Sequence, residues 1–365
     1  METIKVGVVG CGNISDIYFQ NLSEFDKVDV FACADLKEEL ALEKAERYQI
    51  PNALSVPELL EHPEIELVIN LTPPKVHADL SIRALENDKH VYSEKPLAVT
   101  KEDGLRILEK ANEKGRMAGS APDTFLGGGL QTCQDLVQSG AIGDPVAATA
   151  FMMSSGPEQW HPNPDFFYQE GAGPLMDMGP YYLTALIQML GPIEAISASA
   201  STHYPERVIQ SGERKGEVIK VETPTHFSGN LTFKSGVEGV MMMSFDIAAP
   251  HPPSIVIYGT EGTLRVPDPN HFGGPIFLQR KGEVDWTEVD IRYSYVENSR
   301  GIGVLDMVTS IQEGTPFRAN GQLAFHVLDA MKAFYESSDQ GERVRLGSTC
   351  APSPLLEESL QKTRG

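Results

Sequence analysis

The sequence predicts an α/β protein with a doubly wound parallel sheet in its N-terminal part and a large, open, mostly antiparallel sheet in its C-terminal part. Three observations predict this class. Strand and helix patterns alternate from residue 4 to about residue 121, a glycine-rich turn directly follows the first strand, and short strands with Gly and Pro turns dominate after residue 192. A chain of 365 residues is too long for one ordinary core, so two domains are expected.

The first unit of this alternation carries a nucleotide-type turn. Residues 4–9 form an apolar run typical of a buried parallel strand, and a helical pattern begins near Ser15. The glycines between them would let the backbone approach a pyrophosphate at the helix N-terminus. Ser15 stands where a third glycine is usual, and its small side chain still permits close packing. The predicted dinucleotide contacts in this turn are Gly10, Cys11, Gly12, Asn13 and Ile14.

The second strand, residues 28–34, ends at Asp35, about 20 residues beyond the glycine turn. A carboxylate there can accept hydrogen bonds from ribose hydroxyls and repel a 2′-phosphate, which favours NAD over NADP. Lys37 would weaken that repulsion. The alternative is that Asp35 only caps the helix predicted over residues 37–48.

Two more strands end in candidate site residues at the same edge of the sheet. The strand at residues 66–71 is broken by Thr72, Pro73 and Pro74, and a helix opens at His77. The strand over residues 89–93 delivers Glu94 and Lys95 to its carboxyl end, and a helix follows from Thr100 to Gly115. Because ligands bind beyond the carboxyl ends of the strands in such sheets, one crevice should collect Gly10, Asp35, Thr72 and Lys95.

Lys95 is the candidate catalytic cation of this half. It places an ammonium where a cofactor and a substrate would meet, and Pro96 disfavours the α region for it. The alternative is that Glu94 and Lys95 form a solvated pair at a strand end.

The composition changes after residues 117–121, so we divide the chain into domains 1–121 and 122–365. A helix over residues 129–139 and a strand over 146–153 lead to an aromatic loop, residues 160–168. Trp160, His161 and Asp165 in this loop are candidate substrate contacts, because aromatic faces stack on sugar C–H surfaces and polar groups bind hydroxyls. A rigid surface loop is the alternative.

The rest of the second domain reads as a sheet with few helices to cover it, which predicts a homodimer or homotetramer formed through that face. Its predicted strands span residues 195–201, 225–233, 237–245, 254–259 and 263–266, and its helices span 303–313 and 323–336.

Asp177 is the only charged residue between Gly171 and Gly191. A lone carboxylate in so apolar a segment would cost several kcal/mol if it were buried without a partner, and we nominate Lys95 as its cation. In a helix, Asp177, Tyr181 and Thr184 would share one face. The alternative is that Asp177 caps the helix and Tyr181 packs in the core.

Composition narrows the function classes. A formal charge of −21 disfavours nucleic acid and membrane surfaces as partners. The chain opens without a signal region and has no apolar stretch of roughly 18 residues, so a cytoplasmic location is expected. Four well-separated cysteines predict free thiols and no metal site.

Together these motifs resemble the Gfo/Idh/MocA family, the relatives of glucose–fructose oxidoreductase and inositol dehydrogenase. The resemblance spans essentially the whole chain. It implies an NAD(P)-binding Rossmann domain at 1–121, a substrate-binding and oligomerisation domain at 122–365, and nicotinamide-dependent oxidoreduction of a sugar, glycoside or polyol. The motifs that carry it are Gly10 to Ser15, Thr72-Pro73-Pro74 with His77, Glu94-Lys95-Pro96, and Gly171 to Gly179.

The resemblance also implies site residues. Lys95 and Asp177 are catalytic, and Lys95, Asp177 and Tyr181 contact substrate. Many relatives carry His where this chain has Tyr181, four residues after the aspartate, so the proton-transfer role of Tyr181 is a departure from the family pattern. Further cofactor contacts, beyond the glycine turn, are Asp35, Thr72, Pro73, Pro74, His77, Glu94 and Lys95.

Alcohol oxidation needs a base for the hydroxyl proton. A free tyrosine has a pKa of about 10, and an adjacent ammonium lowers it, so Lys95 and Tyr181 would act as a unit. Alternatively, Lys95 itself shuttles the proton. Two other functions stay open: an enzyme with tightly bound NAD that works by transient oxidation, as an epimerase or glycosidase, and a non-catalytic nucleotide or sugar sensor.

Overall fold

The computed structural model describes residues 3–249 and 252–357, and the chain forms two compact units. Unit 1 comprises residues 1–127, 294–328 and 353–365, and unit 2 comprises residues 128–293 and 329–352. The sequence-based division at residues 121 and 122 treats each domain as one continuous segment. The compact units are discontinuous, because the chain returns to unit 1 after residue 293.

Unit 1 is built on a six-stranded parallel sheet in the order β3-β2-β1-β4-β5-β6. All four residues of β4 are buried, as expected for a strand covered on both faces. The strand order reverses between β1 and β4, which confirms the predicted doubly wound sheet. The strands are β1 (Ile4–Val9), β2 (Val28–Ala34), β3 (Asn52–Leu54), β4 (Leu67–Asn70), β5 (His90–Ser93) and β6 (Ala118–Ser120).

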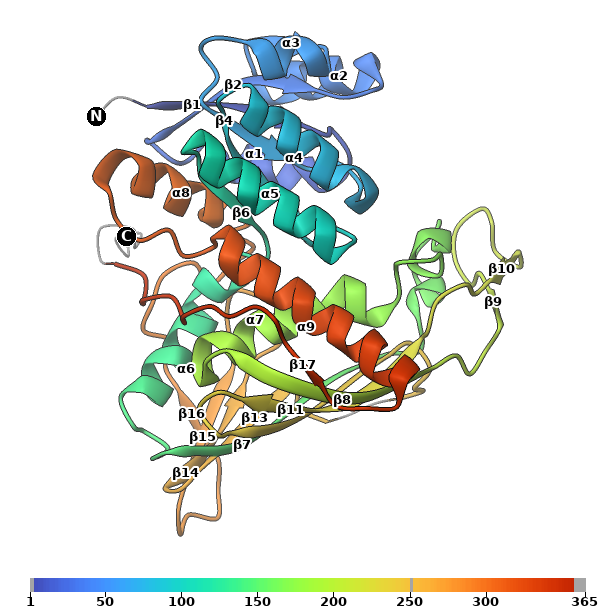
Figure 1. Cartoon of the computed structure of the whole chain (residues 1–365), viewed down its shortest axis with the longest axis vertical. Helices are drawn as coiled ribbons and strands as arrows, with labels where there is room; N and C mark the ends of the chain where they lie inside the picture. Colours follow the sequence, from blue (N-terminus) through green and yellow to red (C-terminus); the bar gives the residue numbers. More distant parts are fainter. Residues whose placement is uncertain (1–2, 250–251, 358–365) are drawn as a thin grey trace. The chain divides into compact units, whose positions relative to one another are not determined.

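Helix α5 of unit 1 begins and ends at local capping signals. Thr100 caps α5 by accepting a hydrogen bond from the Asp103 N–H, and the helix ends at Gly115, whose φ is +61°. Helix α4 lies beside α5 (Figure 1). Strands β3 and β6 and helix α3 are too short to show a period, and they were not predicted. The helices are α1 (Ser15–Leu22), α2 (Glu38–Tyr48), α3 (Val56–Glu61), η1 (Pro74–Val76), α4 (His77–Glu86), α5 (Lys101–Lys114), η2 (Thr124–Leu126) and α8 (Ile302–Glu313).

Unit 2 is built on a nine-stranded sheet in the order β16-β15-β14-β13-β7-β12-β11-β8-β17. Only the β7–β12 pair is parallel among the described strands of this sheet, which confirms a mostly antiparallel sheet. The strands are β7 (Pro145–Met153), β8 (Ile193–Ser201), β11 (His226–Phe233), β12 (Glu238–Ser244), β13 (Ile255–Gly259), β14 (Gly262–Val266), β15 (Ile276–Arg280), β16 (Thr287–Val289) and β17 (Val344–Arg345).

Helices cover one face of this sheet. Helix α7 (Pro174–Leu190) packs on β7, β11 and β12, and α6 (Gly128–Gln138) packs on β14. Along β7, Ala148, Ala150 and Met152 are buried, whereas Thr149 and Phe151, which alternate with them, are half-buried. Within the described residues, the alternation leaves a second face without a helical cover. Helix α9 (Gly321–Gln340) contributes residues to both units.

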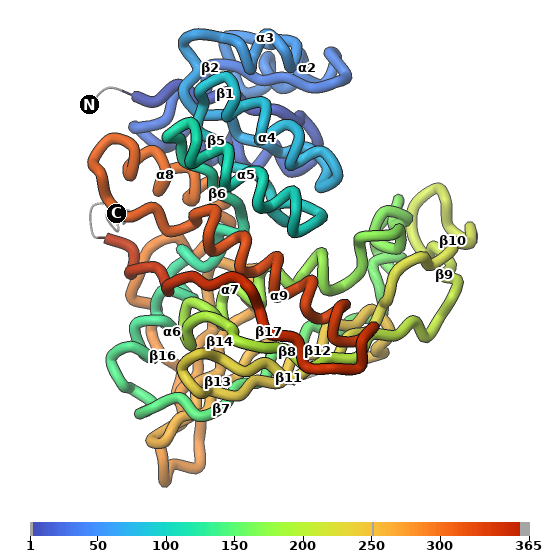
Figure 2. The backbone as a smooth tube through the Cα atoms, viewed as in Figure 1, coloured from blue at the N-terminus to red at the C-terminus, as the bar shows by residue number. Residues whose placement is uncertain are grey.

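A two-stranded sheet of β9 (Glu206–Val208) and β10 (Val218–Lys220) extends from unit 2. We call residues 202–223 the β-arm. In Figure 2 the β-arm runs beside the segment that holds η3 (Pro157–Gln159) and η4 (Asp165–Phe167). Arg214 of the β-arm is bonded to Asp165, so the two segments form one local structure.

Candidate active site

The glycine turn of unit 1 fits a pyrophosphate. Gly10 has a φ of +104°, and a Cβ there would lie 2.7 Å from the carbonyl carbon and oxygen of Leu71. A Cβ on Gly12 would meet no atom of the described residues within 4 Å, apart from its own chain neighbours, so this position is open to a ligand. Ser15 is fully buried, and its hydroxyl donates to the Gly12 carbonyl at 2.6 Å. Ser15 occupies the position of the usual third glycine, and its hydrogen bond stabilises the turn.

Asp35 fastens this turn to the end of β2. Its Oδ2 accepts the Cys11 N–H at 2.8 Å, and its Oδ1 accepts the Lys37 N–H at 2.9 Å. The N-cap of α2 is Lys37, with no side-chain cap bond among the described residues, so Asp35 fixes the glycine turn and does not cap this helix. Its half-buried position leaves lone pairs for ribose hydroxyls.

Hydrogen bonds to Asn70 hold the turn after β4. Its side-chain oxygen accepts the Thr72 N–H at 3.2 Å and the Thr72 hydroxyl at 2.6 Å. Its amide nitrogen donates to the His77 carbonyl at 3.1 Å and to the Ser81 hydroxyl at 3.2 Å. Pro73 and Pro74 remain exposed, as a ligand-facing turn requires.

The His77 ring does not present a nitrogen to a ligand. It is fully buried, with Nδ1 at 2.7 Å from the Pro96 carbonyl oxygen and Nε2 at 2.6 Å from the Thr72 carbonyl oxygen. Burial lowers the pKa of His77, and the two carbonyls oppose that effect. In this structure the imidazole joins the turn after β4 to the turn after β5, so we revise its predicted cofactor contact to a supporting role.

Glu94 and Lys95 stand at the carboxyl end of β5, as predicted, and both are half-buried. The Glu94 carboxylate accepts the Tyr18 hydroxyl at 2.8 Å through Oε1 and the Lys95 N–H at 3.0 Å through Oε2. The Lys95–Pro96 peptide bond is cis. Glu94 therefore fixes the backbone of Lys95, which a solvated pair at a strand end would not do.

Sequence reasoning missed Asp123 beside this edge. Its buried Oδ2 accepts the N–H groups of Gly301 at 2.8 Å and Gly303 at 3.0 Å, where the returning chain enters α8. Burial is the main cause that raises the pKa of Asp123 to about 6. The one available signal was its position after the Ala121–Pro122 bond at the end of β6, which parallels Glu94-Lys95-Pro96 after β5.

In unit 2, Asp177 lies in the first turn of α7 and is not its N-cap. The N-cap is Gly173, with a φ of +91°, and a Cβ there would lie 2.7 Å from the Pro224 carbonyl oxygen. The Asp177 N–H donates to the Gly173 carbonyl at 3.0 Å. Asp177 is half-buried and Tyr181 is 7% exposed, and their i, i+4 spacing places both on one side of the helix, as predicted.

The aromatic loop presents rings to solvent. Trp160 is 65% exposed, and its ring lies edge-on to His161 with centroids 5.4 Å apart. His161 Nδ1 accepts the Asn163 N–H at 3.0 Å, so Nε2 is the ring nitrogen that a ligand could bond. Trp160 and His161 therefore keep the character of ligand contacts.

The Asp165 carboxylate forms an ion pair with Arg214, which the sequence did not predict. Arg214 donates to both of its carboxylate oxygens, at 2.6 and 3.0 Å, and these hydrogen bonds lower the pKa of Asp165. A bidentate ion pair of this kind uses the carboxylate to tie the loop to the β-arm. We revise its predicted contact with sugar hydroxyls to that structural role.

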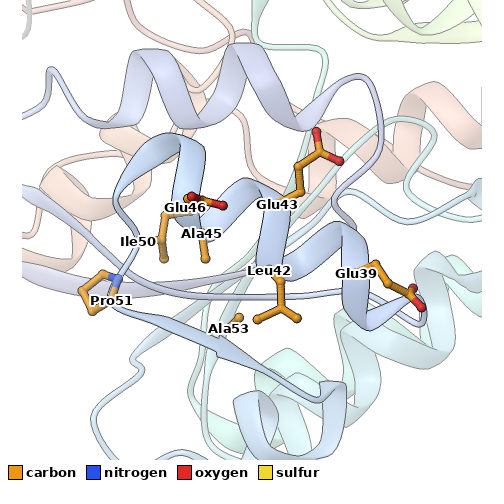
Figure 3. Close-up of a pocket in the computed structure, with 8 residues that line it drawn as sticks. All are labelled: Glu39, Leu42, Glu43, Ala45, Glu46, Ile50, Pro51 and Ala53. Atoms are coloured by element: carbon orange, nitrogen blue, oxygen red, sulfur yellow. The ribbon is translucent and has the colours of Figure 1, made fainter.

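A hollow of about 660 Å³ lies against α2 in unit 1 (Figure 3). Leu42 points toward Ala53 at its floor, while the Glu43 carboxylate points away from it. Three glutamates on its lining would repel a phosphate, so it does not compete with the glycine turn as a cofactor site. The lining residues are Glu39, Leu42, Glu43, Ala45, Glu46, Ile50, Pro51 and Ala53.

Residues 3–249 and 252–357 contain neither a candidate membrane span nor a cluster of metal-ligating side chains. None of the helices there is long and apolar enough to cross a membrane. The same residues contain no group of three or more His, Cys, Asp or Glu side chains arranged to hold a metal ion.

Comparison with known proteins defines the class. Residues 4–121 match the oxidoreductase family with an NAD-binding Rossmann fold, and residues 130–265 match the GFO/IDH/MocA C-terminal domain. The chain belongs to the Gfo/Idh/MocA family and is an NAD-binding oxidoreductase, which confirms the resemblance seen in its motifs.

Individual relatives share less of the sequence. A dTDP-3,4-didehydro-2,6-dideoxy-alpha-D-glucose 3-reductase of Saccharopolyspora spinosa is 27% identical over 78% of this chain and 82% of its own. A myo-inositol 2-dehydrogenase of Thermotoga maritima is 24% identical over 72% of this chain and 74% of its own. The fold matches a levoglucosan dehydrogenase solved with NADH and levoglucosan, with a TM-score of 0.82 at 20% identity, over 95% of this chain and 100% of that one.

Proposed function

We propose that this protein is an NAD-dependent dehydrogenase that interconverts a secondary alcohol and a carbonyl on a sugar, glycoside or polyol. The observation that carries the proposal is that an open glycine turn, held by Asp35, shares one sheet edge with Lys95. The relatives named for sugars and inositol support the substrate class.

The residues of unit 1 fit the cofactor. Gly10 and Gly12 admit the pyrophosphate. Among the described residues, no side chain caps the start of α1, so the first N–H groups of this helix could bind an anion. Asp35 would hold the adenosine ribose and disfavour a 2′-phosphate. The neighbouring Leu36 side chain is 95% exposed, and packing against an adenine ring would bury its apolar surface. NAD, when bound, supplies or accepts the hydride.

Lys95, Asp177 and Tyr181 are the proposed catalytic residues. A phenol needs a nearby cation to serve as a base near neutral pH, so we assign Lys95 and Tyr181 to proton transfer as a unit. Asp177 would orient a substrate hydroxyl. In the alternative assignment, Lys95 shuttles the proton and Tyr181 only binds substrate.

Trp160 and His161 are the proposed substrate contacts of unit 2. The exposed indole offers a face to sugar C–H groups, and His161 Nε2 offers one hydrogen bond. Asp165 and Arg214 would hold the loop that presents them.

A second copy is the proposed partner, held through the face of the nine-stranded sheet opposite α7. Among the outward side chains on this face are apolar ones that are incompletely buried, namely Phe151, Val240 at 45% exposure and Tyr258 at 40%. Val240→Glu should shift the oligomer toward monomer in light scattering, and Asn230→Glu on the neighbouring strand should do so less. An unchanged mass for both variants would reject this face.

A cytoplasmic location is part of the proposal. All four cysteines are free thiols, and three of them are buried, which suits a reducing compartment.

The decisive experiment measures NADH formation by the purified protein with NAD and, separately, NADP across sugars, glycosides and inositols. We expect turnover with NAD that Lys95→Met lowers by roughly a thousandfold or more, with NAD affinity changed by only about a few-fold. Lys110→Met, on a residue that pairs with Glu113 on α5, is the matched control and should keep full activity.

Because Tyr181 stands where many relatives carry histidine, we retain a second class of function. In this class the protein is either an enzyme that retains its NAD or a non-catalytic sensor. Calorimetric NAD binding without NADH production on the whole panel would favour this class. Substrate turnover without net NADH would select the retained-cofactor enzyme over the sensor.

A further inference from the structure

Tyr18 is a buried polar residue of α1 that the proposed chemistry does not use. It lies in α1 with 0% exposure, and its hydroxyl donates to Glu94 Oε1 at 2.8 Å. Burial, with Glu94 and Asp123 nearby, raises the pKa of Tyr18 well above its usual value. The phenol therefore remains a hydrogen-bond donor throughout the working pH range.

The acceptor of this bond is clamped on both sides. Glu94 Oε2 accepts the Lys95 N–H at 3.0 Å, and the Glu94 N–H donates to the Asn70 carbonyl at 2.8 Å. Glu94 is only half-buried, so without the Tyr18 hydroxyl its carboxylate gains hydration by turning outward. That rotation would release the Lys95 N–H.

The returning chain seals Tyr18 from water. Gly301 packs against its ring, since a Cβ built there lies 3.7 Å from Tyr18 Cδ1. Asn21, three residues further along α1, donates to the carbonyls of Asn298 at 2.9 Å and Arg300 at 2.8 Å. The Asn21 side chain holds this segment over α1, and Tyr18 is fully buried, so the Tyr18–Glu94 bond is protected from competing water.

We infer that Tyr18 is a positioning residue, which orients the backbone of Lys95 through the Glu94 carboxylate. The inference rests on the proposed function, in which Lys95 is the catalytic cation. A chain of two hydrogen bonds reaches from the helix beside the pyrophosphate turn to the reacting end of the site. Small displacements of a catalytic group lower kcat with little effect on cofactor binding, which gives the inference a kinetic signature.

The test removes one oxygen atom with Tyr18→Phe. We expect kcat to fall about tenfold while KM for NAD stays within about twofold. Independently of turnover, hydrogen exchange of the Lys95 amide, followed by mass spectrometry in a peptide spanning residues 91–97, should accelerate at least about fivefold. Tyr48→Phe is the matched control, because Tyr48 donates to Asp16 at 2.9 Å in the same unit, and it should change neither quantity.

A double mutant separates positioning from packing. In a Glu94→Ala background, Tyr18→Phe should cause no further loss of kcat, whereas independent packing losses would multiply. Multiplying losses, or an unchanged exchange rate at Lys95 in the single variant, would overturn the inference. If the wild-type protein turns over no substrate, the proposed function fails, and the exchange measurement still decides the role of Tyr18.

Discussion

The loops of the two units are held by different kinds of bond. In unit 1, His77 and Asp123 bond to backbone groups, and Glu94 bonds to a backbone N–H and one phenol. In unit 2, an ion pair of Arg214 with Asp165 joins the β-arm to the aromatic loop, and an ion pair of Arg207 with Glu158 joins it to η3. Salt should screen the half-exposed Arg214 pair more than the buried Arg207 pair or the backbone bonds of unit 1.

Arg207 is the centre of the unit 2 network. Its guanidinium donates to Glu158 at 3.0 Å and to Asp246, and all three side chains are at most 7% exposed. Tyr168 donates to Glu158, and Thr225 donates to Asp246 at 2.8 Å. This buried cluster joins the base of the β-arm to η3 and to the end of β12.

The largest expected effect comes from breaking that cluster. Arg207→Met would leave two buried carboxylates without their cation and should lower the free energy of unfolding by about 3–5 kcal/mol. Denaturant titration measures it. Arg345→Met is the control, because Arg345 is 74% exposed in its pair with Glu194 and should cost less than about 1 kcal/mol. Equal losses in the two variants would show that burial does not set the difference.

The raised pKa of Asp123 should make stability fall as pH rises, whereas the contribution of a surface ion pair is lost as pH falls. Its pKa is raised from 3.8 to about 6, so the folded state keeps a proton that the unfolded chain has lost between those values. Stability should therefore be greatest below about pH 4 for this group and decline by about 3 kcal/mol as pH rises through 6. Denaturation at several pH values should show this slope in the wild type, and its persistence in Asp123→Asn would contradict the assignment.

His77→Ala tests the backbone bonds of unit 1. The neutral imidazole, which lies against the carbonyls of Thr72 and Pro96, would lose its one donated hydrogen bond, at a cost of about 1–3 kcal/mol in unfolding free energy. NAD affinity should fall as well, because the turn after β4 is no longer tied in place. Calorimetry measures that affinity, and an unchanged value would mean that the turn holds its shape without the imidazole. His62→Ala serves as the control, because the half-buried His62 ring accepts only the nearby Glu64 N–H, at 3.3 Å, among the hydrogen bonds of the described residues.

The smallest effect is expected at the Arg214–Asp165 pair, where the side chains are 34% and 39% exposed. Asp165→Asn should change stability by less than about 1 kcal/mol, and added salt should erase the difference. Arg214 lowers the pKa of Asp165, so the small contribution is present at neutral pH and lost as pH falls through that pKa. The measurable result is a raised KM for substrate at low salt with kcat unchanged. A loss of kcat instead would contradict the purely structural role of Asp165.

The sequence by itself determined the class, the parallel sheet, and the sheet edge that carries Gly10, Asp35, Thr72 and Lys95. These follow from local rules, since apolar runs, glycine turns and prolines act on neighbouring residues. The i, i+4 placement of Asp177 and Tyr181 also needed only a helical period.

Only the tertiary structure decided which side chains face a ligand and which support the loops. Nothing near His77 in the sequence places the Pro96 carbonyl against its ring, and nothing near Asp165 places Arg214 beside it. Asp123 and Tyr18 were missed because their partners, Gly301 and Glu94, are 178 and 76 residues away. Residue type and spacing determine what a side chain can do, and long-range packing determines which of those bonds it makes.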